Sequence, residues 1–547
     1  MSSTPQPPAK STFTVIFDGK PVEVPKDLNL IEAAKLAGVS IPHFCFHPRL
    51  SVVGQCRMCL VEIEGMPKIQ AACTTPLKDG LSVKTTTEKV RQSRAATMEF
   101  LLINHPLDCP ICDQAGECTL QDNSFGYGHQ LSRFDEAKRQ YPSFDRTMIG
   151  PHIIADMTRC IQCTRCIRYC QEIAGTSELT FLDRGGRTLV WTHDGRPLDN
   201  DWSAGAADVC PVGALTTREF RFRSRVWYLR KTPSVCPGCN VGCNISIENK
   251  DNVVYRFLPR LNPEVNDFWL CDYGRFLSES LNARDIEKAS VRGSDGPADA
   301  PVPAAIDRIA EAIRQASPSQ VLFLGSANLS NEENFLLRKL SDHIGCFNRD
   351  VVVDRPRPRK IKSKTTWVEG DHAGANFAGA RDMGLTPTRG GYGLDAVLEG
   401  KTAPDVLLVA DGAFSAIADD PAKVATLRRA RFLAVFARTS NALTRAADVV
   451  LPAASHAEKE GTFTNVQGRV QRFERAFLPK PPVRAHGELL LLLANRLGFG
   501  DRSWAPEDLR LQIESEVEGY ADRSQAELDG GAVTTKGLFD AVETPER

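Results

Sequence analysis

The sequence predicts a multidomain protein that combines α/β and α+β folds. Its 547 residues exceed the length of one ordinary domain and predict about three to five domains. Sixteen of its 17 cysteines lie before residue 272, in groups with short, regular spacings. Beyond residue 303, strand-like apolar runs alternate with helical patterns, which is typical of a doubly wound parallel sheet. The chain therefore divides into a cysteine-rich half and an α/β half.

Composition and charge exclude several classes of protein. The formal net charge is -1, so we expect no nucleic-acid partner and no broad attraction to anionic lipid. The first residues, MSSTPQPPAKSTF, lack the apolar core of a secretory signal, and the longest apolar run, LLLLLA at 489–494, is too short to span a bilayer. We therefore expect a reducing compartment, no direct membrane insertion, and cysteines that bind metal rather than form disulfides.

Residues 11–90 predict a small β-grasp domain. The stretch TFTVIFDG alternates apolar and polar residues into an Asp18-Gly19 turn, which is a hairpin signal. NLIEAAKLAG follows as a helix, with Asn29 as its N-cap and Gly38 just past its end. Downstream stand the four cysteines of site 1, which are Cys45, Cys56, Cys59 and Cys73.

Site 1 predicts a [2Fe-2S] cluster. Four cysteines on a loop beside a sheet suit this cluster, because each of its two irons needs two outer thiolates. Gly54 would let the backbone approach the inorganic sulfides, where N–H groups stabilise negative charge. A structural zinc site is the alternative, and the long gap between Cys45 and Cys56 disfavours it.

Residues 91–140 carry a histidine ahead of three cysteines, in HPLDCPICDQAGECTLQD. A helix expected over 87–105 would deliver the histidine to the cysteines. Together they form site 2, which is His105, Cys109, Cys112 and Cys118. The residues alone leave two alternatives open: a [4Fe-4S] cluster with one histidine, or a zinc site. In a cluster the neutral imidazole would raise the reduction potential, and its other nitrogen would need a partner.

Residues 141–230 contain the pattern of a bacterial ferredoxin. The stretch DMTRCIQCTRCIRYC supplies three cysteines on a tight loop, and a fourth precedes Pro211 at a distance. Site 3 is Cys160, Cys163, Cys166 and Cys210, and it predicts a [4Fe-4S] cluster. One tetrahedral zinc ion cannot easily take three ligands from so tight a loop. Cys170 is left over, and we expect it to be a buried free thiol.

Residues 231–288 predict a small β-rich lobe around a fourth set of donors. Site 4 is Cys236, Cys239, Cys243 and Cys271. Apolar alternation in NISIENKDNVVYRFLP indicates strands between its third and fourth donors. A zinc knuckle is the alternative, but the long gap before Cys271 favours a [4Fe-4S] cluster. The remaining cysteine, Cys346, lies in the apolar stretch HIGCFN and is expected in the core.

This order of ligand sets resembles that of the large iron–sulfur subunit of respiratory complex I, which is the G chain of NADH:quinone oxidoreductases. The resemblance covers residues 11–285, and HPLDCPICDQAGECTLQD is close to a signature of that family. It implies one [2Fe-2S] and three [4Fe-4S] clusters, with iron bound by the sixteen donors and no catalytic residue in this chain. The protein would be cytoplasmic, and peripheral on the inner face of a bacterial plasma membrane through its complex.

The resemblance also implies a direction of electron flow. Electrons would arrive from a flavin-bearing, NADH-oxidising subunit and leave towards the quinone-reducing subunits. They would pass from site 1 to site 3 and then to site 2. Site 4 lies off this path and would have a structural role, because metal binding supplies folding free energy to small domains.

Four arginines flank the ligand sets, and they are Arg57, Arg159, Arg165 and Arg168. In one interpretation they offset the negative charge of thiolate-bound clusters and so help to set the reduction potentials. In the other they form solvated or partner-facing salt bridges.

The half after residue 288 resembles a shortened molybdopterin oxidoreductase domain. The stretch LPAASHAEKEGTFTNVQGRVQ is similar to a loop of that family, as is the motif of site 4. We expect a linker at 289–303, a truncated doubly wound α/β domain at 304–500 and a polar tail at 501–547. No cysteine with a nearby histidine looks placed to bind molybdenum in this short domain, where Cys346 is the only candidate. No molybdopterin is therefore expected.

Three segments of this half carry weaker signals. GSANLS, after a strand, is a weak nucleotide signal, and glycine-rich 380–395 predicts a loop of undetermined function. The tail includes EDLRLQIESEVEGY, which predicts a helix on the surface of a partner.

Three other functions compete with the complex I interpretation. A molybdenum-dependent, NAD-linked formate dehydrogenase has a similar front half but usually carries two ferredoxin triples, and this chain has one. The electron-transfer (diaphorase) subunit of an NAD-reducing hydrogenase resembles residues 11–230 but generally stops there. A zinc-stabilised binding scaffold would be colourless and would contain zinc in place of iron and sulfide.

Overall fold

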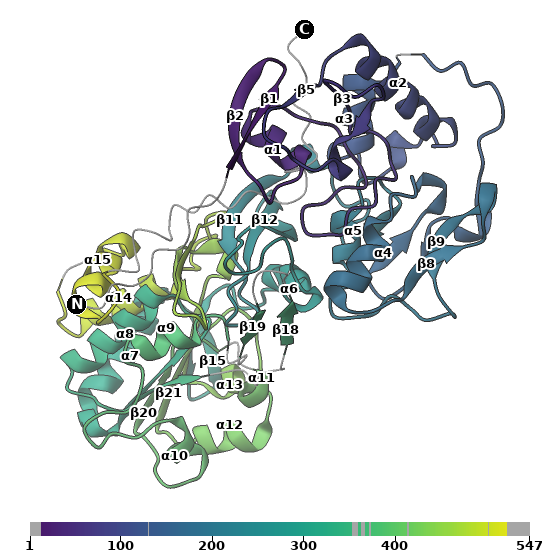
Figure 1. Cartoon of the computed structure of the whole chain (residues 1–547). Coiled ribbons are helices and arrows are strands. Elements are labelled where there is room, and N and C mark those ends of the chain that lie inside the picture. Colours follow the sequence, from purple (N-terminus) through teal and green to yellow (C-terminus); the bar gives the residue numbers. More distant parts are fainter. Residues whose placement is uncertain are drawn as a thin grey trace, which may run out of the picture. The chain divides into compact units, whose positions relative to one another are not determined.

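The computed structural model describes residues 12–129, 131–352, 359–362, 367–370, 374–412, 415–500 and 503–521. The described chain forms two compact units, which divide in sequence between Tyr228 and Leu229 (Figure 1). None of the helices in these ranges has the length and the apolar character needed to cross a membrane. Each unit is described separately below.

The N-terminal unit begins with a five-stranded mixed sheet in the order β2-β1-β5-β3-β4. The strands are β1 (Thr12–Phe17), β2 (Lys20–Pro25), β3 (Leu60–Ile63), β4 (Gln70–Ala71) and β5 (Leu81–Lys84). Asp18 and Gly19 have positive φ angles, which is why two residues suffice to turn β1 into β2. Helix α1 (Leu30–Leu36) begins at Asn29 with a capping box completed by Glu32. The predicted hairpin and helix are both confirmed.

Short elements make up the rest of the N-terminal unit. The helices are α2 (Glu88–Ile103), α3 (Thr119–Tyr127), α4 (Arg165–Tyr169) and α5 (Gly205–Val209). The strands are β6 (Thr147–Met148), β7 (Ile153–Ala155), β8 (Leu179–Leu182), β9 (Leu189–Thr192) and β10 (Leu215–Thr217). The helix expected over 87–105 is confirmed as α2. Its buried face includes Arg94, whose guanidinium donates to the carbonyl of Leu60 at 3.0 Å and so ties α2 to the first sheet.

The C-terminal unit begins with the three-stranded antiparallel sheet that contains site 4. It consists of β11 (Arg230–Val235), β12 (Asn244–Lys250) and β13 (Val253–Pro259), followed by helix α6 (Asp272–Asn282). The strands expected in NISIENKDNVVYRFLP are therefore confirmed as β12 and β13.

The remainder of this unit is built on a seven-stranded sheet in the order β15-β14-β22-β21-β20-β16-β17. Its strands are β14 (Ala289–Gly293), β15 (Gly296–Ala300), β16 (Val321–Ser326), β17 (Arg349–Val352), β20 (Val406–Val409), β21 (Phe432–Ala437) and β22 (Val449–Pro452). The five from β22 to β17 are parallel, and the β14–β15 hairpin adds an antiparallel edge. Two further hairpins are β18 (Arg359–Lys362) with β19 (Trp367–Gly370), and β23 (Gly461–Thr464) with β24 (Val470–Phe473).

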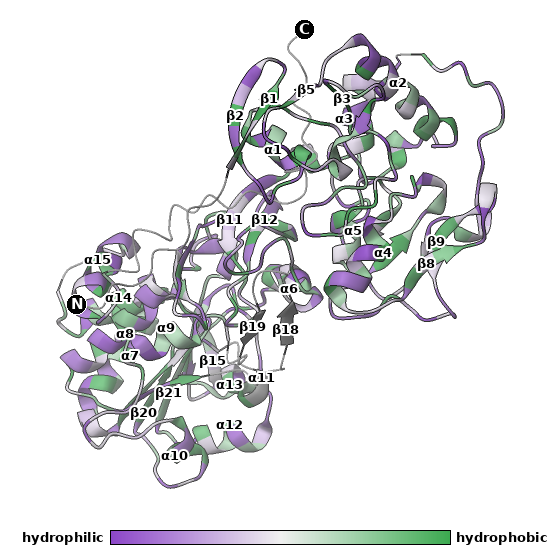
Figure 2. Ribbon diagram, in the orientation of Figure 1, coloured by the Kyte–Doolittle hydropathy of each residue, from purple (hydrophilic) through white to green (hydrophobic). Residues whose placement is uncertain are grey.

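Helices cover both faces of the parallel sheet (Figure 1). On one face pack α7 (Val302–Gln315), α8 (Asn331–His343) and α14 (His486–Arg496), and on the other α10 (Leu394–Leu398), α11 (Ser415–Ala418), α12 (Pro421–Leu427) and α13 (Ala442–Ala446). In β16, Val321 and Phe323 point into the first core, whereas Leu322 and Leu324 point into the second. Strands buried on both faces are apolar throughout, as the green colour of β20 and β21 in Figure 2 shows. The prediction of a doubly wound sheet is confirmed.

Two sequence predictions for this unit need correction. The stretch 289–303 is not a linker, because it forms the β14–β15 hairpin and the start of α7. Its small and polar residues are tolerated because β15 is a mostly exposed edge strand. The stretch 380–395 is a loop only in its middle, since it begins inside α9 (Phe377–Asp382) and ends inside α10. Cys346 is fully buried in the first core, as expected.

The tail begins with helix α15 (Pro506–Glu516), as its sequence predicts. This helix packs on α8 of its own unit. Ile513 and Tyr520 are buried against Phe335 and Met383, and the Tyr520 hydroxyl lies 2.7 Å from that of Thr464. The predicted helix is confirmed, and its contact with a partner stays a prediction. Residues 522–547 lie outside the described part of the chain.

Candidate iron–sulfur sites

The four cysteines of site 1 converge. The thiol of Cys45 forms hydrogen bonds with those of Cys56 and Cys73, and the thiol of Cys59 does so with Cys73. These contacts lower the pKa of Cys45 and Cys59 and, together with burial, raise that of Cys56 and Cys73. The backbone approaches closely here, because a Cβ atom on Gly54 would lie 2.9 Å from Cγ2 of Thr74. Gly54 has a φ of +62° and so makes a turn that L side chains rarely adopt.

All four donors of site 2 line one cavity of about 300 Å³. Helix α2 ends just before His105, a short turn (Cys109–Ile111) presents Cys109 and Cys112, and Cys118 is the N-cap of α3. Burial and the nearby Arg159 and Lys138 lower the pKa of His105 to about 4, so the imidazole is neutral at pH 7, as a metal ligand must be. The His105 ring also forms a hydrogen bond with the backbone of Arg159. One ring nitrogen of His105 therefore has a partner, as a metal-bound imidazole requires of its second nitrogen.

Glycine makes room beside the thiols of site 2. A Cβ atom on Gly213 would lie 2.2 Å from Sγ of Cys112, so no larger residue fits there. Sequence reasoning missed this contact, and it also missed Arg225, which donates to the carbonyl of Cys112 at 2.6 Å. Both residues lie about a hundred positions along the chain from Cys112, where no spacing rule could have linked them to it.

Site 3 brings Cys210 to the tight cysteine triple. Gln162 and Thr164 have positive φ angles, which let the backbone wind through the loop between Cys160 and the start of α4. The N–H of Gln162 donates to Sγ of Cys160 at 3.3 Å, a contact that stabilises a thiolate. Burial, with repulsion from Cys210, raises the pKa of Cys160 to about 12 and of Cys163 to about 11. Iron binding must therefore displace protons from these thiols.

Cys170 is fully buried at the start of a short π-helical turn, Cys170–Ala174. Burial raises the pKa of its thiol to about 12, so it stays protonated and inert at neutral pH. The expectation of a buried residue is confirmed.

Site 4 joins the three-stranded sheet to helix α6. Three of its cysteines lie between β11 and β12, and Cys271 is the N-cap of α6. A Cβ atom on Gly274 would lie 2.8 Å from Sγ of Cys236 and 3.7 Å from Sγ of Cys271, so the two thiols meet over this glycine. Burial raises the pKa of Cys236 and Cys243 well above the usual thiol value.

The stretch 451–471, which resembles a loop of molybdopterin oxidoreductases, holds the loop of site 4. Asn465 Nδ2 donates to the carbonyl of Val241 at 3.1 Å, and Gln471 Nε2 donates to that of Gly242 at 2.9 Å. Gln471 Oε1 in turn accepts a hydrogen bond from Asn244 Nδ2 at 2.5 Å. Site 4 is thus built into the α/β part of the C-terminal unit.

Among the described residues, no three His, Cys, Asp or Glu side chains are grouped so that they could hold a single metal ion. A cluster differs from one ion in this respect, because the donors of a [4Fe-4S] core bind different iron atoms.

Three of the four flanking arginines are buried. Arg159, Arg165 and Arg168 are each at most 5% exposed, whereas Arg57 is exposed. The buried three bond within this chain, so the solvated interpretation is wrong for them.

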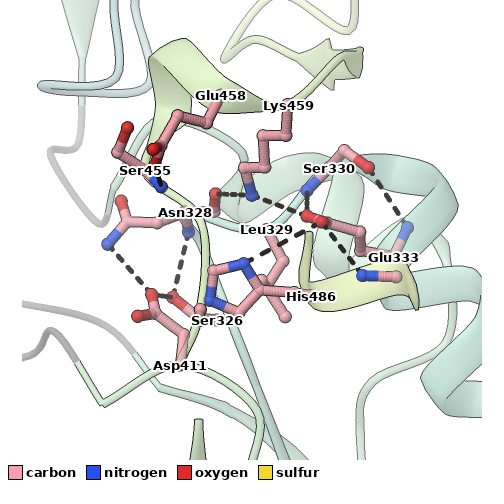
Figure 3. Close-up of polar contacts among 12 residues, drawn as sticks. Ser326, Asn328, Leu329, Ser330, Glu333, Asp411, Ser455, Glu458, Lys459 and His486 are labelled. Carbon is pink, nitrogen blue, oxygen red and sulfur yellow. Dashed lines mark hydrogen bonds and ion pairs between the residues drawn. The ribbon is translucent and has the colours of Figure 1, made fainter. Parts of the chain in front are cut away.

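A second group of buried polar side chains lies at the carboxyl ends of β16 and β20 (Figure 3). Ser326 Oγ donates to Asp411 at 2.8 Å, and Lys459 Nζ donates to Glu333 at 2.6 Å and to the carbonyl of Asn328 at 3.2 Å. Doubly wound sheets bind ligands at this kind of position, but here the chain's own side chains meet there.

The GSANLS segment belongs to the same group. Ser330 and Glu333 form a reciprocal capping box at the start of α8, and the Ser326 hydroxyl accepts from the N–H of Asn328 at 3.0 Å. These helix-capping contacts explain the serine and asparagine residues without a nucleotide.

Comparison with known domain families gives five matches. They are a 2Fe-2S iron–sulfur cluster binding domain (10–88), the NADH-ubiquinone oxidoreductase-G iron–sulfur binding region (94–133), the ferredoxin-like domain of NADH-quinone oxidoreductase subunit 3 (150–216), the NDSU1/NuoG-like 4Fe-4S domain of NADH-ubiquinone oxidoreductase (229–279) and molybdopterin oxidoreductase (359–486). The chain is therefore a mixed α/β multidomain protein with 2Fe-2S and 4Fe-4S iron–sulfur domains and a molybdopterin oxidoreductase domain.

Individual proteins similar to this chain give a more specific comparison. The mitochondrial NADH dehydrogenase [ubiquinone] iron-sulfur protein 1 of Solanum tuberosum is 40% identical over 62% of this chain and 46% of its own length. A subunit of the NADH-quinone oxidoreductase of Rickettsia bellii is 41% identical over 61% of this chain and 49% of its own length. The mitochondrial NADH-ubiquinone oxidoreductase 78 kDa subunit of Neurospora crassa is 40% identical over 66% of this chain and 48% of its own length.

The resemblance to the large iron–sulfur subunit of complex I is thereby confirmed. The chain is similar to subunits of NADH-quinone oxidoreductase over 61–66% of its length. It spans about half the length of these curated relatives.

Proposed function

We propose that this chain is the electron-transfer subunit of an NADH:quinone oxidoreductase. It would accept electrons from a flavin-containing NADH-oxidising subunit and pass them towards the quinone-reducing subunits, at the cytoplasmic face of the membrane. One observation carries this proposal: the ligand loops of sites 1, 3 and 2 contact one another in that order within the N-terminal unit. The names of the relatives favour this function over a formate dehydrogenase or a hydrogenase subunit.

The sixteen donors fit four clusters. Site 1 would hold a [2Fe-2S] cluster and sites 2, 3 and 4 a [4Fe-4S] cluster each, through the residues given above. A bound cluster supplies one-electron transfer at its site. The cavity bounded by the donors of site 2, and the glycines beside the thiols of sites 2 and 4, support this assignment. The five-stranded mixed sheet around α1 supports a β-grasp fold for the first domain.

Contacts between loops support the order of electron flow. Gln55, next to a ligand of site 1, donates from Nε2 to the carbonyl of Gln162 in the loop of site 3 at 2.8 Å. Asp108, next to a ligand of site 2, accepts a hydrogen bond at 2.9 Å from Arg159, which precedes Cys160 of site 3. Site 3 is therefore the middle member of the relay. Site 4 lies in the other unit, where its contacts with Asn465 and Gln471 support a structural role.

The metal content of the full chain tests the assignment. Purified anaerobically with its native neighbours, the protein should be brown and should contain iron and acid-labile sulfide in equal amounts, in the quantity of one two-iron and three four-iron clusters. Zinc should be absent in stoichiometric amounts. A colourless protein that contains zinc in place of iron would contradict the proposal and favour a zinc scaffold.

The His105→Cys variant tests the role of the histidine at site 2. A fourth thiolate would add negative charge, so the cluster should remain bound but its reduction potential should fall by about 100 mV or more. Redox titration followed by EPR measures this midpoint, and the midpoint of site 1 in the same sample serves as the internal control. An unchanged midpoint at site 2 would mean that His105 is not a ligand.

A further inference from the structure

Arg168 connects the loops of sites 1 and 3. Its Nη2 donates to the carbonyl of Cys45 at 2.6 Å and to that of Cys163 at 3.3 Å, and its Nη1 donates to the carbonyl of Ser51. Arg165 stands beside it and donates to the carbonyl of Phe46 at 2.5 Å. One buried guanidinium thus holds a ligand residue of each of the two sites.

Arg159 occupies the corresponding position between sites 3 and 2. It directly precedes Cys160 of site 3, and it also lines the cavity of site 2. Its guanidinium donates to Asp108 at 2.9 Å and lies 3.2 Å from Asp156, and its backbone bonds the ring of His105. Arg159 is among the largest fully buried side chains of the protein.

Burial of a guanidinium group requires a compensating interaction, which the carboxylates of Asp108 and Asp156 supply in part for Arg159. A buried positive charge costs several kcal/mol unless negative charge lies nearby. Carbonyl oxygens accept the hydrogen bonds of Arg168 but do not neutralise its charge. The carbonyls of Cys45 and Cys163 both accept from Nη2 of Arg168, so the thiolates of these two residues would supply negative charge near the same guanidinium once they bind iron. The positive charge in turn favours the reduced, more negative state of any cluster beside it.

We propose that Arg168 and Arg159 are positioning residues of the relay, each of which links two neighbouring sites and raises the reduction potential of both. Arg168 acts on sites 1 and 3, and Arg159 acts on sites 3 and 2. This inference rests on the proposed function, because it requires clusters at the three sites. It goes further because it assigns one arginine to each pair of neighbouring sites, and the charge of that arginine raises the reduction potentials of both.

The two arginines make a crossed experiment possible. Arg168→Gln and Arg159→Gln would be prepared in the full chain with its native neighbours, and iron content would be measured before EPR redox titration of each site. Arg168→Gln should lower the midpoints of sites 1 and 3 and leave site 2 unchanged. Arg159→Gln should lower those of sites 3 and 2 and leave site 1 unchanged. The exposed Arg184, in the same domain, provides the control variant Arg184→Gln, which should leave all midpoints unchanged.

Lysine variants separate charge from shape. Arg168→Lys and Arg159→Lys keep the positive charge, so they should retain the clusters and midpoints close to those of the original chain, even where the glutamine variants lose iron. Iron-loaded glutamine variants with unchanged midpoints would overturn the inference, and so would equal loss of iron from the lysine and glutamine variants. A chain that contains no iron before any substitution would instead refute the proposed function itself.

Discussion

Changing Cys160 and Cys163 together to serine should abolish electron transfer through the N-terminal unit. Both residues are proposed donors of site 3, whose loop contacts site 1 on one side and site 2 on the other. A serine hydroxyl is a poor ligand for iron compared with a thiolate, and two of the four donors would be lost. Loss of an outer-shell partner alone costs metal sites about 10–100-fold, so NADH–quinone turnover should fall by more than about 100-fold.

The matched control for this double variant is Cys170→Ser. Cys170 lies four residues after Cys166, is fully buried, and is not among the proposed donors of any site. Its variant should keep the iron, the EPR signal of site 3 and the turnover of the complex. Both variants would be compared by iron analysis, EPR and turnover in the assembled complex. Full turnover in the double variant with site 3 empty would remove site 3 from the electron path.

The sequence could propose the sixteen donors because the chemistry of metal binding fixes the type and spacing of such residues. A cysteine triple at 160–166 has few other physical uses, and helix α2 follows from its apolar pattern. The residues that organise the donors could not be predicted in the same way. Gly213 and Arg225 reach Cys112 only after the chain has folded, and no local pattern marks them.

The errors in the C-terminal half have a common physical origin. Small, polar sequences at 289–303 and 503–521 lack the long apolar runs of buried strands and helices, so composition predicts a linker and a polar tail. In the fold these segments cover edges: β15 ends the sheet, and α15 buries little beyond Ile513 on α8. An edge element needs few apolar residues, because only one of its sides is buried. Composition therefore cannot distinguish it from a linker.

The Lys459→Met variant should destabilise the C-terminal unit by about 3–5 kcal/mol, because it leaves a buried carboxylate without its cation. Glu333 is fully buried in the first turn of α8, and Lys459 is 4% exposed (Figure 3). Burial alone would raise the pKa of Glu333, but the charge of Lys459 and the hydrogen bonds from Lys459 and from the N–H of Ser330 lower it below the usual value, so the carboxylate is ionised at pH 7. Methionine fills a similar volume but cannot compensate this charge.

The loss should appear as faster hydrogen exchange in peptides from β16 and α8, together with a lower midpoint of denaturation of the full chain. Because Glu333 can take up a proton once its cation is gone, the destabilisation should be smaller at pH 5 than at pH 7. Adding Glu333→Gln should recover part of the loss, since the glutamine carries no charge but can still accept the hydrogen bond from the N–H of Ser330.

An exposed ion pair of the same unit supplies the matched control. Lys288 and Asp299 lie 2.7 Å apart, about as close as Lys459 and Glu333, but both side chains are 68% exposed. Water already solvates these charges, so Lys288→Met should leave the midpoint of denaturation almost unchanged. Equal effects of the two methionine substitutions would contradict the argument from burial. A small effect of Lys459→Met at pH 7 would mean that water or protonation compensates the charge of Glu333.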